Sequence, residues 1–397
     1  MGHEYRKKTG RPSIEISGEV TDAVHDILSA VRDRGDDAVR EFTGRFDDVD
    51  RESIRVTDEE IEAASAEVSA ADRETIDATI ENVREFHEEQ REQIAGFEGE
   101  FHPGIHVGQR VVPVESAGVY VPGGRDPLVA APAMTVVPAV IAGVGRIVAC
   151  APRPPPAAHG PSARWPTAPR ASTPSTTSAA PATSLPPKRQ VYGNVGIDFL
   201  AGPTEVLLLA DGTADPALVA TDLLAQAEHD TDSRPVPITT DETLAREPMD
   251  ELDAQLPDLR TEDVARECWA ENGEVIVADT MAEAVDLTDG YAMGHLQVVT
   301  ADPRALMDDL HNYGSLFLGE GSPVVFGDEA AGTNYGLPTL EISTYSGGIW
   351  VGTYLEVTHQ EATEEGAAFL ADHAAAICEI EGTQAHRLSA EARRHDE

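Results

Sequence analysis

The chain has 397 residues, of which 41% are hydrophobic, and its 71 Asp and Glu far outnumber its 29 Lys and Arg, for a formal net charge of −42. This excess of negative charge repels phosphates, so nucleic acids and anionic membranes are poor candidate partners. The acids are interspersed along predicted helices such as residues 72–90, which is typical of an acidic coat that keeps a protein soluble in concentrated salt. A halophilic source is therefore our hypothesis.

The cysteines and the N-terminus indicate the compartment. Cys150, Cys268 and Cys378 are widely spaced and form no CxxC pair, so we expect buried thiols rather than a disulfide framework. The first residues are polar and lack the apolar core of a signal peptide, and no run approaches the roughly 18 apolar residues of a membrane span. We expect a cytoplasmic protein.

The first third of the chain predicts helices and then a mixture of strand and helix. Residues 17–95 repeat apolar positions at helical spacing, and Thr57 with Glu60 forms a capping-box pattern. A strand at 110–121, a helix at 134–144 and a strand at 146–150 are expected next. Gly143 and Gly145 end a predicted helix instead of opening one, so we interpret them as a helix C-cap rather than a dinucleotide-binding loop.

Residues 151–187 differ from everything around them. They hold 11 of the chain's 27 prolines, counted from the sequence, and no Asp or Glu. Proline at this density predicts neither helix nor central strand. A linker, a disordered functional loop and a stretch translated out of frame would each explain the segment. We favour the last, because the acids vanish abruptly on entry and patterned sequence returns at Lys188.

The rest of the chain alternates strands and helices, which favours an α/β fold. A buried strand at 205–210 precedes a helix at 216–229, which Asp215 caps and Pro216 opens. The further elements expected are strands at 274–277, 296–300 and 315–318, helices at 281–287 and 304–310, and a helical tail at 361–394.

Three polar residues recur on the helix at 216–229. Asp222, Gln226 and His229 stand at positions i, i+4 and i+7, so they are expected to share one face. A Gln oxygen and a His nitrogen one turn apart could converge on a cation such as zinc. On its own, however, this stretch is explained better by a wet, acidic helix end.

Three further residues are unremarkable when taken singly. His295 is expected at the edge of a strand, Asp328 in a glycine-rich loop, and His386 in solvent near the C-terminus. Spacing alone does not join these residues into one site.

The order of several motifs changes this interpretation. Together they resemble the histidinol dehydrogenase family over nearly the whole chain except residues 151–187. The motifs are Gly108-Gln109, Gly118-Val119-Tyr120-Val121-Pro122-Gly123-Gly124, Ala201-Gly202-Pro203-Thr204-Glu205, the stretch Leu223–Asp230, Gly327-Asp328 with Gly332-Thr333-Asn334, and Glu381 followed by His386.

The resemblance implies an α/β protein with two Rossmann-like domains and helical N-terminal and C-terminal extensions. The first domain would comprise 18–118 and 206–347, the second 119–205 with a disruption at 151–187, and residues 348–397 would form a C-terminal helical segment. Members of the family are zinc-containing, NAD-dependent homodimers. They oxidise an alcohol, L-histidinol, through the aldehyde to the carboxylate of L-histidine.

The resemblance also implies roles for individual residues. The zinc ligands would be Gln226, His229, Asp328 and His386, a borderline set of two oxygens and two imidazoles. His295 would be the general base, Thr204 and Glu381 would contact the substrate together with the base and the ligands, and Tyr120 would contact NAD. Glu381 and His386 would reach the partner subunit's site.

The chain departs from the family pattern at several places. Gly294 stands where the family has a Glu acid/base, Tyr335 where it often has His, and residues 151–187 replace its cofactor-binding Gly-Ala-Gln and Gly-Pro-Gly-Asn segments. Residues 124–128, Thr204 and residues 347–352 are closer to related zinc alcohol dehydrogenases such as the sulfopropanediol enzymes. A catalytically impaired, zinc-binding remnant is the alternative from a different functional class.

Overall fold

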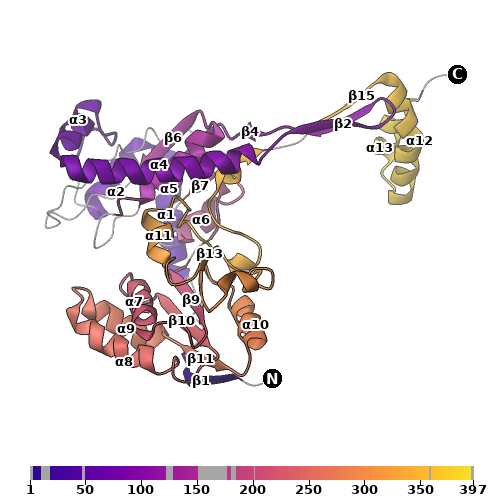
Figure 1. Cartoon of the computed structure of the whole chain (residues 1–397). Helices are drawn as coiled ribbons and strands as arrows, with labels where there is room; N and C mark the ends of the chain where they lie inside the picture. Colours follow the sequence, from indigo (N-terminus) through magenta and orange to yellow (C-terminus); the bar gives the residue numbers. More distant parts are fainter. Residues whose placement is uncertain are drawn as a thin grey trace.

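The computed structural model describes residues 3–9, 18–46, 50–121, 128–150, 177–179, 185–200, 202–356 and 359–394. It is an α/β structure with two largely parallel sheets, which lie in different parts of the molecule (Figure 1). Within these residues no helix is both long and apolar enough to cross a membrane. The three cysteines form no disulfide with one another.

The larger sheet has six strands, and all of its neighbouring pairs are parallel except the pair that contains β1. Its order is β1 (His3–Lys7), β11 (Val275–Ala278), β10 (Arg234–Thr239), β9 (Glu205–Ala210), β12 (His295–Val299) and β13 (Ser315–Leu318). Every residue of β9, β10, β11 and β12 is buried, as expected for parallel strands covered on both faces.

Helices cover both faces of this sheet (Figure 1). Alternate residues of β9 point to opposite faces: Val206 and Leu208 pack with α7–α9, and Leu207 and Leu209 pack with α10. The helices are α7 (Pro216–Ala227), α8 (Glu247–Gln255) and α9 (Glu262–Asn272) on one face and α10 (Met281–Tyr291) on the other. Asp215 caps α7 through the N–H of Ala217, so the predicted helix start is confirmed.

The smaller sheet is parallel throughout, in the order β6 (Arg146–Cys150), β5 (Ser116–Tyr120), β7 (Thr177–Ala179) and β8 (Gly196–Ile197). Helix α5 (Ala131–Ala142) ends at Gly143, whose φ of 92° is the left-handed conformation of a C-cap. The interpretation of Gly143 as a cap rather than a dinucleotide loop is therefore confirmed.

The predicted N-terminal helices are also confirmed, and they lie on the side of the smaller sheet. They are α1 (Gly18–Arg34), α2 (Asp36–Phe46), α3 (Asp58–Glu67) and α4 (Ala70–Glu92), and α3 begins with the predicted Thr57–Glu60 capping box. Helix α4 packs on α5, and α1 packs on α6 (Leu185–Val191). These contacts do not test the predicted domain boundaries, so the first domain at 18–118 with 206–347, the second at 119–205 and the C-terminal segment at 348–397 remain predictions.

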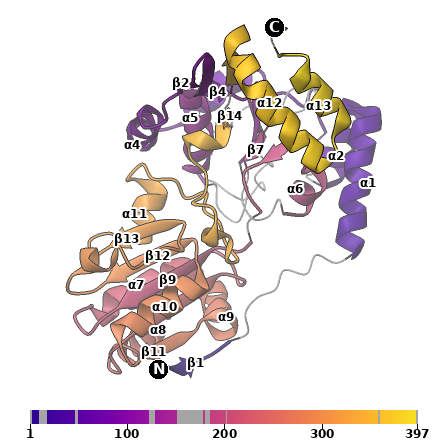
Figure 2. The same cartoon turned by 90° about the vertical axis from the view of Figure 1, so that its right-hand side faces the viewer.

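A C-terminal arm extends from the body. It consists of the antiparallel strands β2 (Phe97–His102), β3 (Ile105–Gln109) and β15 (His359–Ala362), followed by α12 (Glu364–Glu381) and α13 (Gln384–Glu391). Figure 1 shows the strands carrying both helices away from the rest of the chain, and Figure 2 views the arm from its far end. The short strands β4 (Val112–Pro113) and β14 (Leu355–Glu356) pair at its base.

Several sequence expectations were wrong. The single strand predicted at 110–121 is broken into β4 and β5. The helix predicted at 304–310 is only a 3-10 turn, Pro303–Leu306, which the Asp302 side chain caps.

Prolines explain two further differences. Strand β10, with Pro235 and Pro237, was not expected in the middle of a sheet. The carbonyl of Pro235 accepts the N–H of Glu274, so the main chain there faces β11, whose ladder with β10 begins only at Ile238. The missing proline N–H therefore falls where no ladder bond is formed.

Residues 151–187 are not wholly without structure. Thr177–Ala179 contains no proline and forms β7 between β5 and β8. Helix α6 begins at Leu185, with Pro186 and Pro187 in its first turn, where a missing N–H costs nothing. Residues 151–176, and 122–127 with their part of the resemblance, lie outside the described residues.

Candidate functional site

The candidate residues collect at the amino edge of the six-stranded sheet. Glu205, Arg234 and His295 are the first residues of β9, β10 and β12. Gln226 lies in the last turn of α7, because a crossover helix runs antiparallel to its strands and ends at their amino edge. Ligands of open α/β sheets usually bind at the carboxyl edge, so this site is on the opposite side.

His295 is buried at the centre of this edge, only 4% exposed. Its Nδ1 lies 2.8 Å from the main-chain oxygen of Glu205, which can only accept a hydrogen bond, so Nδ1 carries the proton and Nε2 the lone pair. The ring stacks on Phe317 at a centroid distance of 6.3 Å. In its neutral form, the imidazole therefore has one defined basic atom, Nε2.

Asp328 faces that basic atom. Its Oδ1 lies 3.5 Å from His295 Nε2, which is too long for a hydrogen bond, and Nε2 has no hydrogen-bond partner in the part of the chain described. Burial acts to lower the pKa of His295, but the Asp328 carboxylate together with Glu205 outweighs burial, and the pKa is raised. Asp328 was expected in a loop; it lies instead in the short helix α11 (Val324–Glu329).

Gln226 and Thr204 form a second pair at the same edge. Gln226 is buried, and its Nε2 donates to Thr204 Oγ1 at 2.8 Å, which leaves the Gln226 oxygen as the atom able to face a cation. The C-terminal end of α7, with its partial negative charge, adds to that preference.

Asp222 and Gln226 lie one turn apart in α7 and share a face as the sequence predicted, but His229 does not belong to that helix. Helix α7 ends at Ala227, so His229 lies beyond the helix and is exposed. Asp222 instead accepts a hydrogen bond of 2.7 Å from Gln297 of β12, and burial raises the pKa of its carboxyl. Asp222 thus connects α7 to the sheet, and we assign it no role in metal binding.

Glu381 and His386 lie on the arm, and both are exposed. Among the described residues, no three His, Cys, Asp or Glu side chains converge so as to hold a metal ion. One chain therefore does not present the complete predicted ligand set: Gln226 and Asp328 belong to the amino edge, and His386 does not reach it.

The predicted NAD contact is in the other sheet. Tyr120 is the last residue of β5, half-buried at the carboxyl edge of the parallel β5–β6 pair. Residues 122–127, beyond β5, and 151–176, beyond β6, lie outside the described ranges, and Tyr120 is the predicted cofactor contact that the structure places.

Tyr335 stands near the candidate site. Its hydroxyl is buried without a hydrogen-bond partner in the portion of the chain that is described. Burial, with the nearby carboxylates of Glu329 and Asp328, raises the pKa of this phenol, which is therefore neutral and a proton donor.

The sequence analysis did not propose a role for Glu205, which is 3% exposed and lies at the amino edge of the sheet. Its carboxylate accepts the N–H of Gly294 at 3.2 Å, and burial raises its pKa to about 7. A Glu that opens a wholly apolar strand was the available signal, because an acid is almost never buried without a partner.

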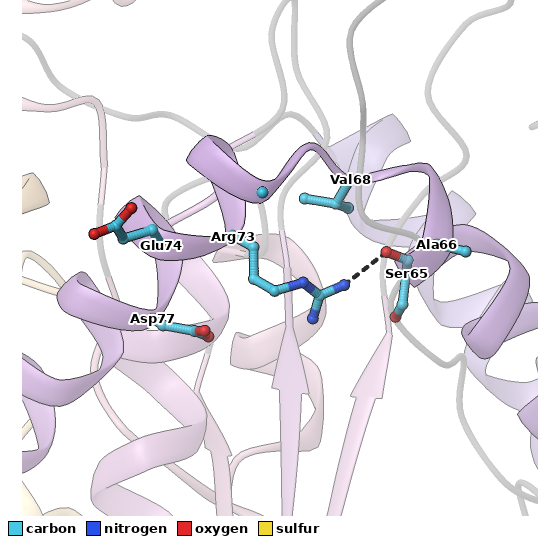
Figure 3. A pocket seen from close by; sticks show the side chains of 7 residues that line it. Ser65, Ala66, Val68, Arg73, Glu74 and Asp77 are labelled. Atoms are coloured by element: carbon cyan, nitrogen blue, oxygen red, sulfur yellow. Dashed lines mark hydrogen bonds between the residues drawn. The ribbon is translucent and has the colours of Figure 1, made fainter.

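A separate open hollow of about 490 Å³ lies between α3 and α4 (Figure 3). Arg73 crosses it to donate to the Ser65 carbonyl at 2.7 Å, and Glu74 and Asp77 line its rim. None of the predicted site residues belongs to these helices, so the hollow is not the candidate site.

Comparisons with known proteins concern the chain as a whole. The family model described as histidinol dehydrogenase matches residues 10–163 and 185–394, and its gap falls within the proline-rich segment. A histidinol dehydrogenase homolog of Shouchella clausii is 39% identical over 97% of both chains. The histidinol dehydrogenase of Methanothermobacter thermautotrophicus is 37% identical, covering 95% of this chain and 94% of the relative.

Two further matches bear on substrate and fold. The sulfopropanediol 3-dehydrogenase of Ruegeria pomeroyi is 36% identical, covering 99% of this chain and 96% of the relative. The crystal structure of histidinol dehydrogenase from Elizabethkingia anophelis superposes with a TM-score of 0.86 at 26% identity, covering 96% of this chain and 93% of that one.

Proposed function

Because the chain belongs to the histidinol dehydrogenase family, we propose that it oxidises a small primary alcohol with NAD and zinc, L-histidinol to L-histidine being the first reaction to test. The observation that supports this proposal best is the buried His295, whose Nδ1–H is held and whose Nε2 faces Asp328. A dehydrogenase needs such a base to take the alcohol proton.

The chemistry divides between the chain and its cofactors. When bound, zinc polarises the alcohol oxygen and NAD accepts hydride. Within the chain, His295 Nε2 takes the hydroxyl proton in the first oxidation, and a second proton after water adds to the aldehyde. Its pKa, raised by Asp328, lets the imidazole hold that proton. Thr204 fixes the amide of Gln226, so that the amide oxygen is oriented before a ligand arrives.

We propose that the ligand set of Gln226, His229 and Asp328 is completed by His386 of the partner subunit in a homodimer, with Glu381 reaching the substrate beside it. The arm supports this: Phe369, Ile377, Ile380 and Leu388 are exposed on its helices, and Phe97 and Phe101 on its strand β2. Apolar side chains gathered on one projecting element are typical of an interface. Each parallel sheet is proposed as a Rossmann-like unit.

Two alternatives rest on particular residues. The relative from Ruegeria, with Thr204 and residues 347–352, favours a small sulfonated diol as the substrate. Gly294, which has no acid, and the segment 151–187, which lacks the family's NAD-binding motifs, favour a zinc-binding chain with little turnover. Loss of one acid/base typically lowers the rate by about 10²–10⁴-fold.

Purified chain with zinc and NAD tests these readings. We expect NADH absorbance to rise with L-histidinol, with His295→Asn as the inactive control, in concentrated KCl. A panel that includes sulfopropanediol separates the two substrates, and a parallel series in low salt tests the halophilic hypothesis. Zinc bound at about one ion per chain without NADH from any alcohol would favour the impaired remnant.

The coding DNA tests the origin of residues 151–187. If the segment is out of frame, one of the other two frames encodes Gly-Ala-Gln and Gly-Pro-Gly-Asn motifs there, and a chain repaired at this place gains turnover. Absence of such motifs from both frames would contradict the frameshift and leave a linker or a functional loop.

A further inference from the structure

Glu205 is a buried ionisable group at the site that the proposed chemistry does not use. Its carboxylate accepts the main-chain N–H of Gly294 at 3.2 Å, and the main chain of Leu340 also favours its ionised form. Gly294 immediately precedes His295, and Leu340 belongs to the loop that crosses the amino edge. The carboxylate therefore binds the segment that leads into the imidazole and faces the loop beside it.

The main chain of the same residue holds the ring itself. The Glu205 carbonyl accepts from His295 Nδ1 at 2.8 Å, and this bond selects the tautomer with a free Nε2. Side chain and main chain of Glu205 thus act on consecutive residues, Gly294 and His295. If the Gly294 peptide turned, the ring bond would turn with it.

The segment is also held from the β13 side, because the Gly294 carbonyl accepts the N–H of Ser315 at 2.8 Å and the Met293 carbonyl accepts that of Gly314 at 3.3 Å. A Cβ built on Gly294 would lie 2.4 Å from the Pro338 carbonyl oxygen, so the loop has closed over the place where a side chain would stand. Leu340 and Glu341 adopt φ of 59° and 66°, a strained conformation for residues with a Cβ.

A cation stands behind the carboxylate. Arg234 pairs in register with Glu205 across β9 and β10, is 7% exposed, and acts electrostatically to favour the ionised Glu205. Arg234 also lies 3.7 Å from Glu274, a second buried acid whose other oxygen accepts from Tyr291. Arg234 therefore interacts electrostatically with two buried acids, Glu205 and Glu274. Of these, Glu205 is the one that contacts Gly294 and His295.

We propose that Glu205 is the positioning residue of His295: its carboxylate holds the Gly294 N–H, and its carbonyl fixes the ring tautomer. This rests on the proposed function only through the role of His295 as a base. Because Gly294 brings no side chain of its own, Glu205 supplies both a side-chain bond and a main-chain bond to this segment, which together form a clamp.

Glu205→Gln tests the clamp while keeping the shape of the side chain. A carboxamide has an acceptor oxygen but no charge, so its bond to the Gly294 N–H is weaker than that of the carboxylate. At pH 9, well above the pKa of about 7, we expect kcat to fall about tenfold with KM unchanged, since a misplaced base slows chemistry more than binding. The Glu205→Asp variant keeps the charge but has a shorter side chain, and we expect a similar decrease in its kcat.

A spectroscopic measurement decides the proposal without turnover. In ¹⁵N-histidine-labelled full-length chain with zinc, the wild type should show His295 protonated at Nδ1, its signals assigned by their absence from His295→Asn. Glu205→Gln should show a mixture of tautomers. Glu274→Gln, the matched control on the same arginine, should keep the wild-type signals and kcat.

The results separate the proposals. A Glu205→Gln variant with the wild-type tautomer would overturn the clamp, and so would a Glu274→Gln variant with the same change. A wild-type chain that makes no NADH but shows the Nδ1–H tautomer, lost in Glu205→Gln, would support the clamp while the proposed oxidation fails.

Discussion

The amino edge of the six-stranded sheet and the C-terminal arm carry the two halves of the predicted site in opposite physical states. At the edge, His295 and Gln226 are buried and each has a defined hydrogen-bond partner. On the arm, Glu381 and His386 are exposed, helices α12 and α13 pack on each other, and α12 also contacts β15 (Figures 1 and 2).

This difference indicates how the site is completed. Residues that hold a base in one orientation must be prepared before substrate binds, and burial within one sheet provides that rigidity. Residues that complete the site can come from a second chain, provided that an apolar interface holds the two chains together. The exposed apolar side chains of the arm supply such a surface, so the comparison predicts a site shared between two chains.

The largest expected effect is at the edge. His295→Asn keeps the size of the side chain but removes the basic Nε2, so kcat should fall by about 10²–10⁴-fold while the melting temperature changes little. Steady-state NADH formation and thermal unfolding measure the two quantities. Activity within tenfold of the wild type would show that another group is the base.

The shared site is tested by mixing two inactive variants. His386→Ala should lose zinc, and His295→Asn should lose turnover. If His386 serves the partner's site, each mixed dimer has one intact site, and random pairing restores about a quarter of wild-type activity. Unfolded chains are mixed, refolded and assayed for NADH. If His386 served its own chain, both sites of a mixed dimer would be defective and no activity would return.

The buried acid of the edge predicts a dependence of stability on pH. Burial raises the pKa of Glu205 to about 7 from an ordinary 4.5, so between these values the folded chain binds more protons than the unfolded chain. Its contribution to stability is therefore present below about pH 4.5 and lost as the pH rises through 7.

Relative to wild type, Glu205→Gln should gain up to about 3 kcal/mol between pH 4.5 and pH 8, because the amide never ionises. Urea unfolding of both variants in concentrated KCl measures the difference, in which the effect of net charge cancels. A difference that stays constant with pH would mean that Glu205 remains ionised throughout.

The smallest expected effect is on the arm. Ile380 is 82% exposed in one chain, and Ile380→Lys should weaken dimerisation by about tenfold to a hundredfold, because a charge then enters an apolar interface. Sedimentation measures the association. Val20→Lys, on the exposed face of α1 at 45%, is the control and should leave it unchanged. If both changes weakened association equally, the arm would not be the dimer interface.

Local patterns determined much of the fold. The Asp215 cap and the apolar run of β9 stand where the sequence predicted them, as does the left-handed Gly143. Each depends on a few neighbouring residues: a side-chain acceptor for an unpaired N–H, a continuous run for a strand buried on both faces, a residue without Cβ for a positive φ. The strongest motifs also predicted which residues to seek at the site.

Only the tertiary structure decided how those residues meet. Helix α7 ends at Ala227, so His229 lies outside the helix that carries Gln226. Strand β10 joins the sheet despite its prolines because its pairing with β11 begins only at Ile238. Glu205 and Gly294 are 89 positions apart in the sequence, and their hydrogen bond follows from the adjacent placement of β9 and β12. Sequence spacing determines which residues share one element, whereas the order of strands determines which elements share a site.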